Sequence, residues 1–272
     1  MTPPFGALAP TSFQESIRAR AARLPDSFIG KRAASLLLRA AGGKSGRAFD
    51  VTVFETERAR LHPYDNISEK RVYITPQFWE AEERAALAAF IAQGAGPLRF
   101  LDVGANAGLY TLFARSAARA SGRGFQAVCV EPSPEMLARL RLNLAASQAG
   151  DDAQVFDCAA GASEGADAFS TNERNRGESR LGGEGGRTVR VRPLSAIIEE
   201  AGAPLIDAMK IDIEGGEPAA RRGLFSACGE RFRPGLIIAE LSHSKQLAAL
   251  IGAEGYREVL RTKRNGVYQR RV

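Results

Sequence analysis

Three charged residues alternate along one short apolar stretch, Met209-Lys-Ile-Asp-Ile-Glu214. Side chains at every second position of a strand point to the same face, so Lys210, Asp212 and Glu214 would share one. Charges on a central strand are costly to bury unless they are paired or project into a site. The pattern therefore predicts an acid–base or ligand-binding cluster at the carboxyl end of this strand. A solvated strand end is the alternative, and Glu217 could simply favour the dipole of the next helix.

A second chemical feature is the loop within Phe100-Leu-Asp-Val-Gly-Ala-Asn-Ala-Gly-Leu-Tyr110. An apolar run ends in Asp102, small residues follow, and an amphipathic run begins, which predicts a strand, a tight turn and a helix. Gly104 and Gly108 let the backbone approach a ligand closely. Asn106 stands where a dinucleotide fingerprint needs its second glycine. An acid at the strand end instead suits a ligand that carries an amine, with an ordinary strand–helix turn as the alternative.

Two further acids follow later apolar runs. Glu131 ends the predicted strand Gln126–Val130, where an acid is placed to accept hydrogen bonds from both ribose hydroxyls of a nucleoside. A solvent-facing strand end is the alternative. Asp157 follows Val155-Phe156, and it and its neighbours, such as Cys158, would lie near the base of such a nucleoside.

The predicted strand Leu236–Leu241 carries Glu240 at its end, and His243 lies just beyond. Asp212 is the first candidate for the general base. Glu240 and His243 could complete an acid–base arrangement, although a lone histidine is more often a surface or capping residue. Asp212 and Glu240 could also bind a divalent metal such as magnesium. The candidate catalytic residues are therefore Lys210, Asp212, Glu240 and His243.

Length and composition bound the class of protein. The 272 residues, 44% of them hydrophobic, suffice for one large α/β domain with an appendage. No apolar run is long enough to span a bilayer, and no signal-peptide pattern opens the sequence, so we expect a cytoplasmic protein. The net charge of +6 invites a nucleic-acid interpretation. The arginines read as scattered, however, and no aromatic residues interleave with them, so solvated surface explains most of this charge.

The hydrophobic periodicity predicts the elements that position these residues. Helices are expected over Ser12–Leu24 and Ile29–Ala41, and a small β meander over 48–74, in which Val72 and Ile74 alternate with polar residues. Another helix is expected to open at Phe78-Trp-Glu80. Residues 1–72 would form an appendage, either a cap over the site or a dimerisation element.

The hydrophobic pattern of the second half of the sequence predicts helices that alternate with strands. Ser133 and Ser195 are expected helix caps, and residues 161–188 read as a long loop in which Phe169 could pair with a strand over Thr188–Leu194. Asn265-Gly266 is expected to form the turn of a terminal hairpin. We therefore predict a Rossmann-like α/β fold over residues 73–272, a mostly parallel seven-stranded sheet that ends in an antiparallel hairpin.

Taken together, these stretches resemble the FkbM family of S-adenosylmethionine-dependent methyltransferases over residues 73–260. The resemblance is carried by Leu101-Asp-Val-Gly-Ala-Asn-Ala-Gly108, Val130-Glu-Pro-Ser-Pro134, Lys210-Ile-Asp-Ile-Glu-Gly-Gly-Glu217 and Glu240. It implies a class I methyltransferase fold and O-methylation of a sugar, glycan or other natural-product hydroxyl. It implies that Asp102, Gly104, Asn106, Gly108 and Glu131 bind the cofactor, and that Lys210, Asp212, Glu214 and Glu217 lie in or beside the active site. The predicted set of cofactor-binding residues is completed by Ala105, Pro132, Asp157 and Cys158.

Two other classes of function remain open. The positive charge motivates an RNA or DNA methyltransferase, but neither an Asn/Asp-Pro-Pro-aromatic motif nor a catalytic cysteine pattern is present, which argues against nucleic acid. A non-catalytic relative could instead bind a partner through residues 1–72, although the intact loop around Asp102 argues against it. The expected partners are S-adenosylmethionine and a hydroxyl acceptor, with a homodimer as a further expectation. The positive net charge of the chain fits an acidic acceptor.

Overall fold

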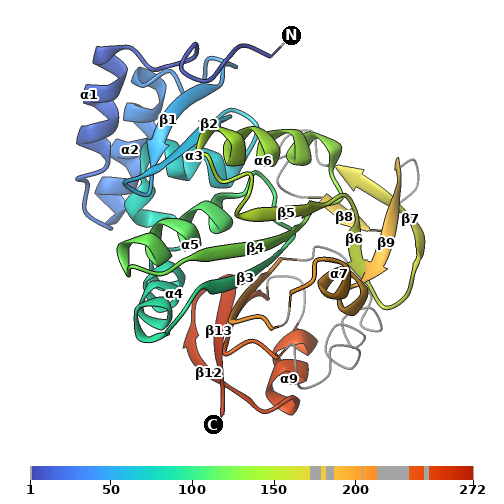
Figure 1. Ribbon diagram of the computed structural model, residues 1–272. Helices are drawn as coiled ribbons and strands as arrows, with labels where there is room; N and C mark the ends of the chain where they lie inside the picture. The colour runs from blue at the N-terminus through green and yellow to red at the C-terminus, as the bar shows by residue number, and fades with distance from the viewer. Residues whose placement is uncertain are drawn as a thin grey trace.

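A seven-stranded sheet forms the centre of the computed structural model, which describes residues 2–171, 179–181, 187–203, 205–212, 233–241 and 245–271 (Figure 1). The strand order is β12-β13-β11-β10-β3-β4-β5, and only β13 runs antiparallel to its neighbours. The strands are β3 (Leu98–Val103), β4 (Phe125–Val130), β5 (Ala153–Phe156), β10 (Ala208–Ile211), β11 (Leu236–Glu240), β12 (Tyr256–Arg261) and β13 (Asn265–Arg270). The predicted fold is confirmed.

The register of β3 and β10 brings the two chemical stretches together. Lys210 pairs with Asp102, and Ile211 pairs with Val103. The strands are parallel, so their carboxyl ends lie at the same edge of the sheet, where ligands bind in open α/β sheets. A backbone hydrogen bond of 2.9 Å from the Asp212 N–H to the Val103 carbonyl extends this pairing beyond the strands.

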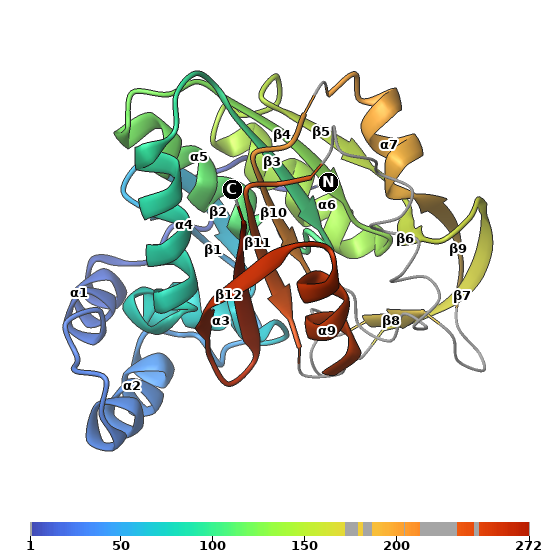
Figure 2. The same cartoon turned by 90° about the horizontal axis from the view of Figure 1, so that it is seen from below.

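Helices cover both faces of the sheet (Figures 1 and 2). On one face α4 (Ala81–Gln93), α5 (Leu109–Ala120) and α6 (Pro134–Ala146) pack in the cluster that contains Phe100. On the other, α7 (Leu194–Glu200) and α9 (Lys245–Ala253) pack in the cluster that contains Leu101. Successive strand residues point to opposite faces, so these neighbours on β3 serve two separate cores.

A second sheet of four strands lies beside the first, in the order β6-β9-β7-β8. Its strands are β6 (Ala159–Gly161), β7 (Gly165–Thr171), β8 (Ser179–Leu181) and β9 (Arg187–Pro193). Phe169 pairs with Arg187, which confirms the predicted pairing of Phe169 with this strand. The interpretation of 161–188 as one loop is wrong for β7 and β8, because Phe169 packs in a small core with Val189 and Ala159.

The chain before the sheet folds into α1 (Ser12–Ala21), α2 (Phe28–Ala40), β1 (Phe49–Val53), β2 (Glu57–Leu61) and α3 (Ile67–Ile74). Both predicted helices and the first part of the meander are confirmed. The strand expected around Val72 and Ile74 is wrong, because these residues lie in α3. The Asn66 side chain caps α3 by accepting a hydrogen bond from the Glu69 N–H, a local signal that the alternation obscured.

The structure also tests several predicted starts of helices and strands. Ser133 caps α6 as expected, with Pro134 at its first position. Ser195 does not cap α7, which begins at Leu194 after Pro193. Asn265 and Gly266 start β13 instead of forming the hairpin turn, because Glu83 accepts a hydrogen bond from the buried Asn265 side chain.

Candidate active site

A pocket opens at the carboxyl ends of β3 and β10. It combines the glycine loop, the end of β10 and two segments from earlier in the chain. Its lining residues are Ser68, Trp79, Glu80, Asp102, Gly104, Ala105, Asn106, Ala107, Leu109, Tyr110, Lys210 and Asp212. Sequence features that lie more than 100 residues apart therefore share one cavity.

Asp102 ends β3 at the floor of this pocket and is almost fully buried. Its Oδ2 accepts hydrogen bonds from the backbone N–H and the hydroxyl of Thr111, at 3.1 and 2.6 Å. Burial raises the pKa of Asp102 to about 6, against the opposing effects of Thr111 and Lys210. A carboxylate held in this way favours a cationic partner, because a buried charge needs compensation.

The loop after Asp102 has a left-handed backbone at three positions. Gly104, Asn106 and Gly108 have φ values of 75°, 52° and 81°. A Cβ on Gly104 would lie 2.2 Å from the backbone oxygen of Asp212, and one on Gly108 would lie 2.5 Å from the Leu140 side chain. The two glycines therefore allow the loop to lie against the end of β10 and against α6. The close approach to a ligand that was expected of them stays a prediction.

Lys210 is buried in the middle of the acidic groups of the site. Its Nζ lies 3.3 Å from Asp212 Oδ2, and it has no hydrogen-bond partner within the described part of the chain. Burial by itself lowers the pKa of Lys210, but the carboxylates of Asp212, Glu80, Glu240 and Asp102 outweigh it and raise that pKa. One cation therefore faces four acids.

Asp212 remains 37% exposed at the side chain and borders the pocket. Burial raises the pKa of its carboxyl, but Lys210 and a hydrogen bond with Glu240 more than offset this and lower it. The structure thus brings Lys210, Asp212 and Glu240 together, as predicted from the strand ends. His243, Glu214 and Glu217 lie outside the described residues.

Glu131 lies at the end of β4, as predicted, but both of its carboxylate oxygens contact backbone. Oε2 accepts from the Asn106 N–H at 2.8 Å and Oε1 from the Ser133 N–H at 2.8 Å. Burial raises the pKa of Glu131 to about 7, although these hydrogen bonds lower it. Each oxygen has a second lone pair, so the carboxylate can hold the loop and still accept from a ligand.

The other expected cofactor residues differ in their surroundings. Pro132 is half-buried and Asp157 is exposed beyond the end of β5. The Cys158 side chain is buried in the second core cluster, and burial raises the pKa of its thiol to about 11. None of these three residues lines the pocket at Asp102.

Sequence reasoning missed Trp79 and Glu80. The expected helix opening at Phe78 is wrong: a 3₁₀ turn ends there, Glu80 has a left-handed backbone with a φ of 41°, and α4 starts at Ala81. Glu80 Oε2 accepts a 2.5 Å hydrogen bond from the Tyr110 hydroxyl. Burial raises the pKa of Glu80, with Lys210 opposing it. A Trp-Glu pair just before a helix was the only sequence signal for this side of the pocket.

Trp79 is buried against Tyr110, with their ring centroids 5.2 Å apart. Its Nε1 has no hydrogen-bond partner in the ranges that the structure describes, although Trp79 lines the pocket. Buried indole N–H groups normally have an acceptor. Trp79 Nε1 and Lys210 Nζ are therefore two buried donors available to a ligand.

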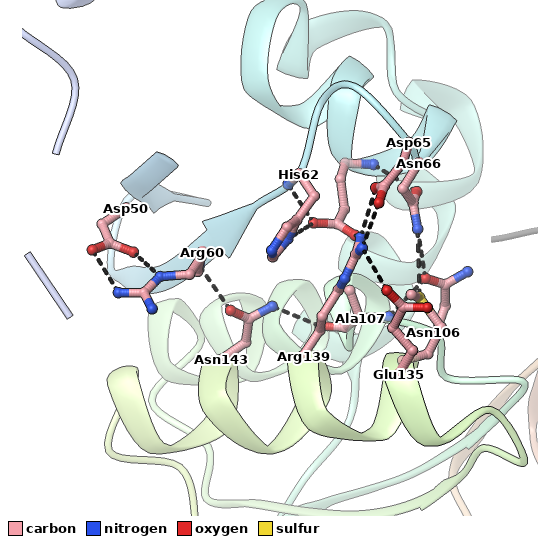
Figure 3. A network of polar contacts seen from close by, with 12 residues as sticks. Asp50, Arg60, His62, Asp65, Asn66, Asn106, Ala107, Glu135, Arg139 and Asn143 are labelled. Carbon is pink, nitrogen blue, oxygen red and sulfur yellow. Dashed lines mark hydrogen bonds and ion pairs between the residues drawn. The ribbon is translucent and has the colours of Figure 1, made fainter. Parts of the chain in front are cut away.

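A polar network joins the N-terminal region to the glycine loop (Figure 3). Asn66 Nδ2 donates to Asn106 Oδ1 at 2.9 Å. On α6, Arg139 donates to both oxygens of Asp65 at 2.9 and 2.7 Å, and to Glu69 Oε1 at 2.7 Å. Asn143, one turn further on, donates to the Ala107 carbonyl at 2.9 Å and accepts from the Arg60 N–H at 2.7 Å. Residues before 73 thus support the loop directly.

This network also shows whether the glycosylation sequon Asn66-Ile-Ser68 is accessible. Asn66 is 2% exposed, and both ends of its amide are in use, one for the α3 cap and one for Asn106. A glycan could not be attached there in the folded protein.

Metal binding was predicted at Asp212 and Glu240. Among the residues that the structure describes, no group of three or more His, Cys, Asp or Glu side chains is arranged to hold a metal ion. The two predicted ligands are adjacent, but the described residues add no third, so metal binding stays a prediction.

The strand order, the glycine loop and the acid-lined pocket define a class I methyltransferase fold. The sequence matches the Methyltransferase FkbM domain over residues 102–264. The match covers more than half of the chain, which therefore belongs to the FkbM methyltransferase family. A comparison with curated protein sequences found no significant relative.

Solved structures of methyltransferases are similar to this chain at low sequence identity. An FkbM methyltransferase from Methylobacillus flagellatus KT matches with 17% identity and a TM-score of 0.50. The match covers 94% of this chain and 58% of that one, so this chain spans little more than half the length of that structure. A Bacillus cereus O-methyltransferase in complex with SAH matches with 16% identity and a TM-score of 0.41, covering 70% of this chain and 81% of that one. A Geobacter metallireducens precorrin-6y C5,15-methyltransferase matches with 15% identity and a TM-score of 0.43, covering 71% and 89%.

Proposed function

We propose that the protein transfers a methyl group from S-adenosylmethionine to a hydroxyl of a sugar, glycan or other small natural product. The observation that carries this proposal is the cluster of Glu80, Asp102, Asp212 and Glu240 around Lys210, beside the glycine loop. Such an excess of carboxylate suits a cofactor with two positive charges, a sulfonium and an ammonium group.

The described residues fit this cofactor. Asp102 would hold its ammonium group, and Glu131 its ribose hydroxyls. The backbone of Gly104 and Asn106 would lie along its aliphatic part, where a Cβ on Gly104 has no room. The Trp79 indole N–H, which has no acceptor among the described residues, and the Lys210 ammonium group, which is ion-paired with Asp212, would be available to its carboxylate or to the acceptor.

The bound cofactor supplies a methyl group with sulfur as the leaving atom. The residues of this chain have to align the acceptor oxygen with that methyl group and take up the hydroxyl proton at or after the transition state. Asp212 is our candidate for the base, because its lowered pKa keeps it ionised and its carboxylate borders the pocket. Lys210, 3.3 Å away, orients it, and Glu240 is hydrogen-bonded to it.

The charge of the pocket also bears on the acceptor. Four acids and one lysine would repel a carboxylate or phosphate beside the methyl group. We therefore favour a neutral hydroxyl acceptor over the acidic one that the net charge of the chain suggested.

We further propose that residues 1–72 form an appendage that caps the site, in preference to a dimerisation element. Ser68 lines the pocket and Asn66 contacts the glycine loop, so this region supports the cofactor site from the side opposite β10.

The first test is calorimetric titration with S-adenosylmethionine and S-adenosylhomocysteine. Wild type should bind both, Asp102→Ala should lose binding, and Arg257→Ala, at an exposed position of β12, should bind like wild type. No binding to wild type, or equal binding to Asp102→Ala, would overturn the cofactor assignment.

The second test is methyl transfer to hydroxylated acceptors, with magnesium and with a chelator. Asp212→Asn should retain cofactor binding but lose at least about a hundredfold in transfer rate, within the usual range for general bases. Full activity of Asp212→Asn would remove it as the base, and loss of wild-type activity in chelator would support the metal prediction.

A further inference from the structure

One short segment near the start of this protein is strongly basic. Residues 11–47 contain eight basic and two acidic side chains, a net charge of +6, whereas the rest of the chain contains 29 of each. The entire net charge of +6 therefore lies in α1, α2 and the turns around them. The arginines themselves are scattered along the chain, as expected, but outside this segment acidic residues balance the basic ones. The basic residues are Arg18, Arg20, Arg23, Lys31, Arg32, Arg39, Lys44 and Arg47.

The same segment carries the most exposed large apolar side chains of the described residues. Phe28, Ile29 and Leu36 on α2 are 73%, 78% and 76% exposed, and Phe13 on α1 is 64% exposed. The other exposed large apolar residues of the described chain lie between 40% and 44%. Clustered apolar exposure on this scale is uncommon unless a surface has a partner.

The two helices turn their other sides to the protein. Ile17 and Ala21 of α1 and Leu38 of α2 pack in the main core cluster. Figures 1 and 2 place both helices at an outer corner of the molecule, away from the four-stranded sheet. The exposed apolar residues therefore lie on the side of the helices that does not pack on the protein core. They face outward beside Arg32 and Arg39.

We propose that the outer face of α1 and α2, defined by Phe13, Phe28, Ile29, Leu36 and the basic residues of 11–47 other than the inward-pointing Arg18, docks on an anionic lipid bilayer. A helix with basic and large apolar side chains on its outward side lies in the headgroup region, apolar groups inserted and cations at the anionic lipids. The described helices include none that is long and apolar enough to cross a membrane. The helices α1 and α2, of 10 and 13 residues, can instead lie in the surface of a membrane.

Charge distinguishes this partner from a second copy of the chain. The two acids of the segment are already paired, Glu15 with Arg18 and Asp26 with Lys31, at 2.7 and 2.5 Å. Two such faces brought together would therefore repel each other. A nucleic acid would match the charge, but its interfaces are polar and offer little to Ile29 and Leu36.

The test is sedimentation of the full chain with vesicles of phosphatidylcholine alone, or mixed with phosphatidylglycerol. We expect binding to the mixed vesicles only, weaker at high salt. The triple variant Phe28→Ser/Ile29→Ser/Leu36→Ser, and separately Arg32→Glu/Arg39→Glu, should each reduce partitioning by at least about tenfold. Val259→Ser and Arg257→Glu, at exposed positions of β12, are the matched controls and should bind like wild type.

Three outcomes would overturn the proposal. They are no binding of wild type to anionic vesicles, equal binding of the α2 variants and the controls, and a dimer in light scattering that the triple variant abolishes. Salt-sensitive binding to single-stranded RNA with no vesicle binding would assign the face to nucleic acid instead. The measurement needs no cofactor or acceptor, so its result is independent of the proposed methyl transfer.

Discussion

Replacing Arg139 by methionine tests whether the polar network holds the N-terminal region on the catalytic domain. The guanidinium is 7% exposed and contacts Asp65, which is 8% exposed, and Glu69, which is fully buried. The Asp65 and Glu69 carboxylates raise the pKa of Arg139 although burial alone would lower it. Methionine preserves most of the side-chain volume but leaves two buried carboxylates without their shared cation.

Breaking a buried ion pair from one side costs about 3–5 kcal/mol. Glu69 keeps the His62 N–H as a donor at 2.6 Å, which places our expectation at the lower end, about 3 kcal/mol. At ~2–4 °C per kcal/mol for a chain of this size, the melting temperature should fall by about 10 °C. Arg141→Met, two positions on and exposed, is the matched control and should change stability by less than ~0.5 kcal/mol.

The assay is chemical and thermal denaturation of both variants at pH 7. A loss below about 1 kcal/mol for Arg139→Met would refute the reasoning, because it would mean that water or a local shift compensates both carboxylates. The same loss for Arg141→Met would show that the effect belongs to α6 in general and not to the ion pairs.

Three further perturbations address the cofactor loop. Asn66→Ser should keep the α3 cap but remove the hydrogen-bond donor to Asn106. The affinity for S-adenosylmethionine should fall about tenfold, with little change in melting temperature. Equal affinities of the variant and the wild type would show that this contact does not position the loop. Gly104→Ala should abolish cofactor binding, because its Cβ would meet backbone at 2.2 Å. Gly96→Ala, with a similar φ of 66° and open space around it, is the control and should cost only about 1–3 kcal/mol of stability. If both alanines behave alike, close approach is not the reason for the glycine. Cofactor affinity should fall as the pH drops below about 7, where Glu131 and then Asp102 take up protons, by up to ~tenfold per pH unit per group. Calorimetry between pH 5.5 and 8.5 measures it, and a flat profile would contradict the carboxylate assignment.

The sign of the last prediction follows from the raised pKa of Asp102. The carboxyl is protonated below about 6, so the charge that would attract the cofactor is present only above that pH. Its pKa in the folded protein exceeds the ordinary value of 3.8, so folding takes up a proton between these pH values. The unliganded protein should accordingly lose stability as the pH rises through this range, while its affinity for the cofactor increases.

The sequence by itself determined the sheet and the position of the loop. Alternating and continuous apolar runs fix strands and helices locally, and the glycines at 104 and 108 mark the turn between them. The alternation of Lys210 with Asp212 likewise placed both on one strand end. Parallel pairing then follows from the helices between the strands, since a parallel strand needs a crossover.

Only the tertiary structure decided what these groups contact. Arg139 finds Asp65 and Glu69 about 70 positions away, and no spacing rule connects residues at that distance. Trp79 and Glu80 line the pocket because the chain turns left-handed at Glu80, a conformation that packing against Tyr110 selects and local propensity does not.

The same physical division explains the two misread segments. Val72 and Ile74 alternate like a strand, but the Asn66 cap and burial of consecutive residues against the core favour the helix α3. Asn265-Gly266 reads as a turn, but Glu83 accepts from Asn265 and draws it into β13. Local sequence sets the elements through backbone preferences, whereas burial and charge pairing, which depend on residues distant in the chain, choose between the conformations that those preferences allow.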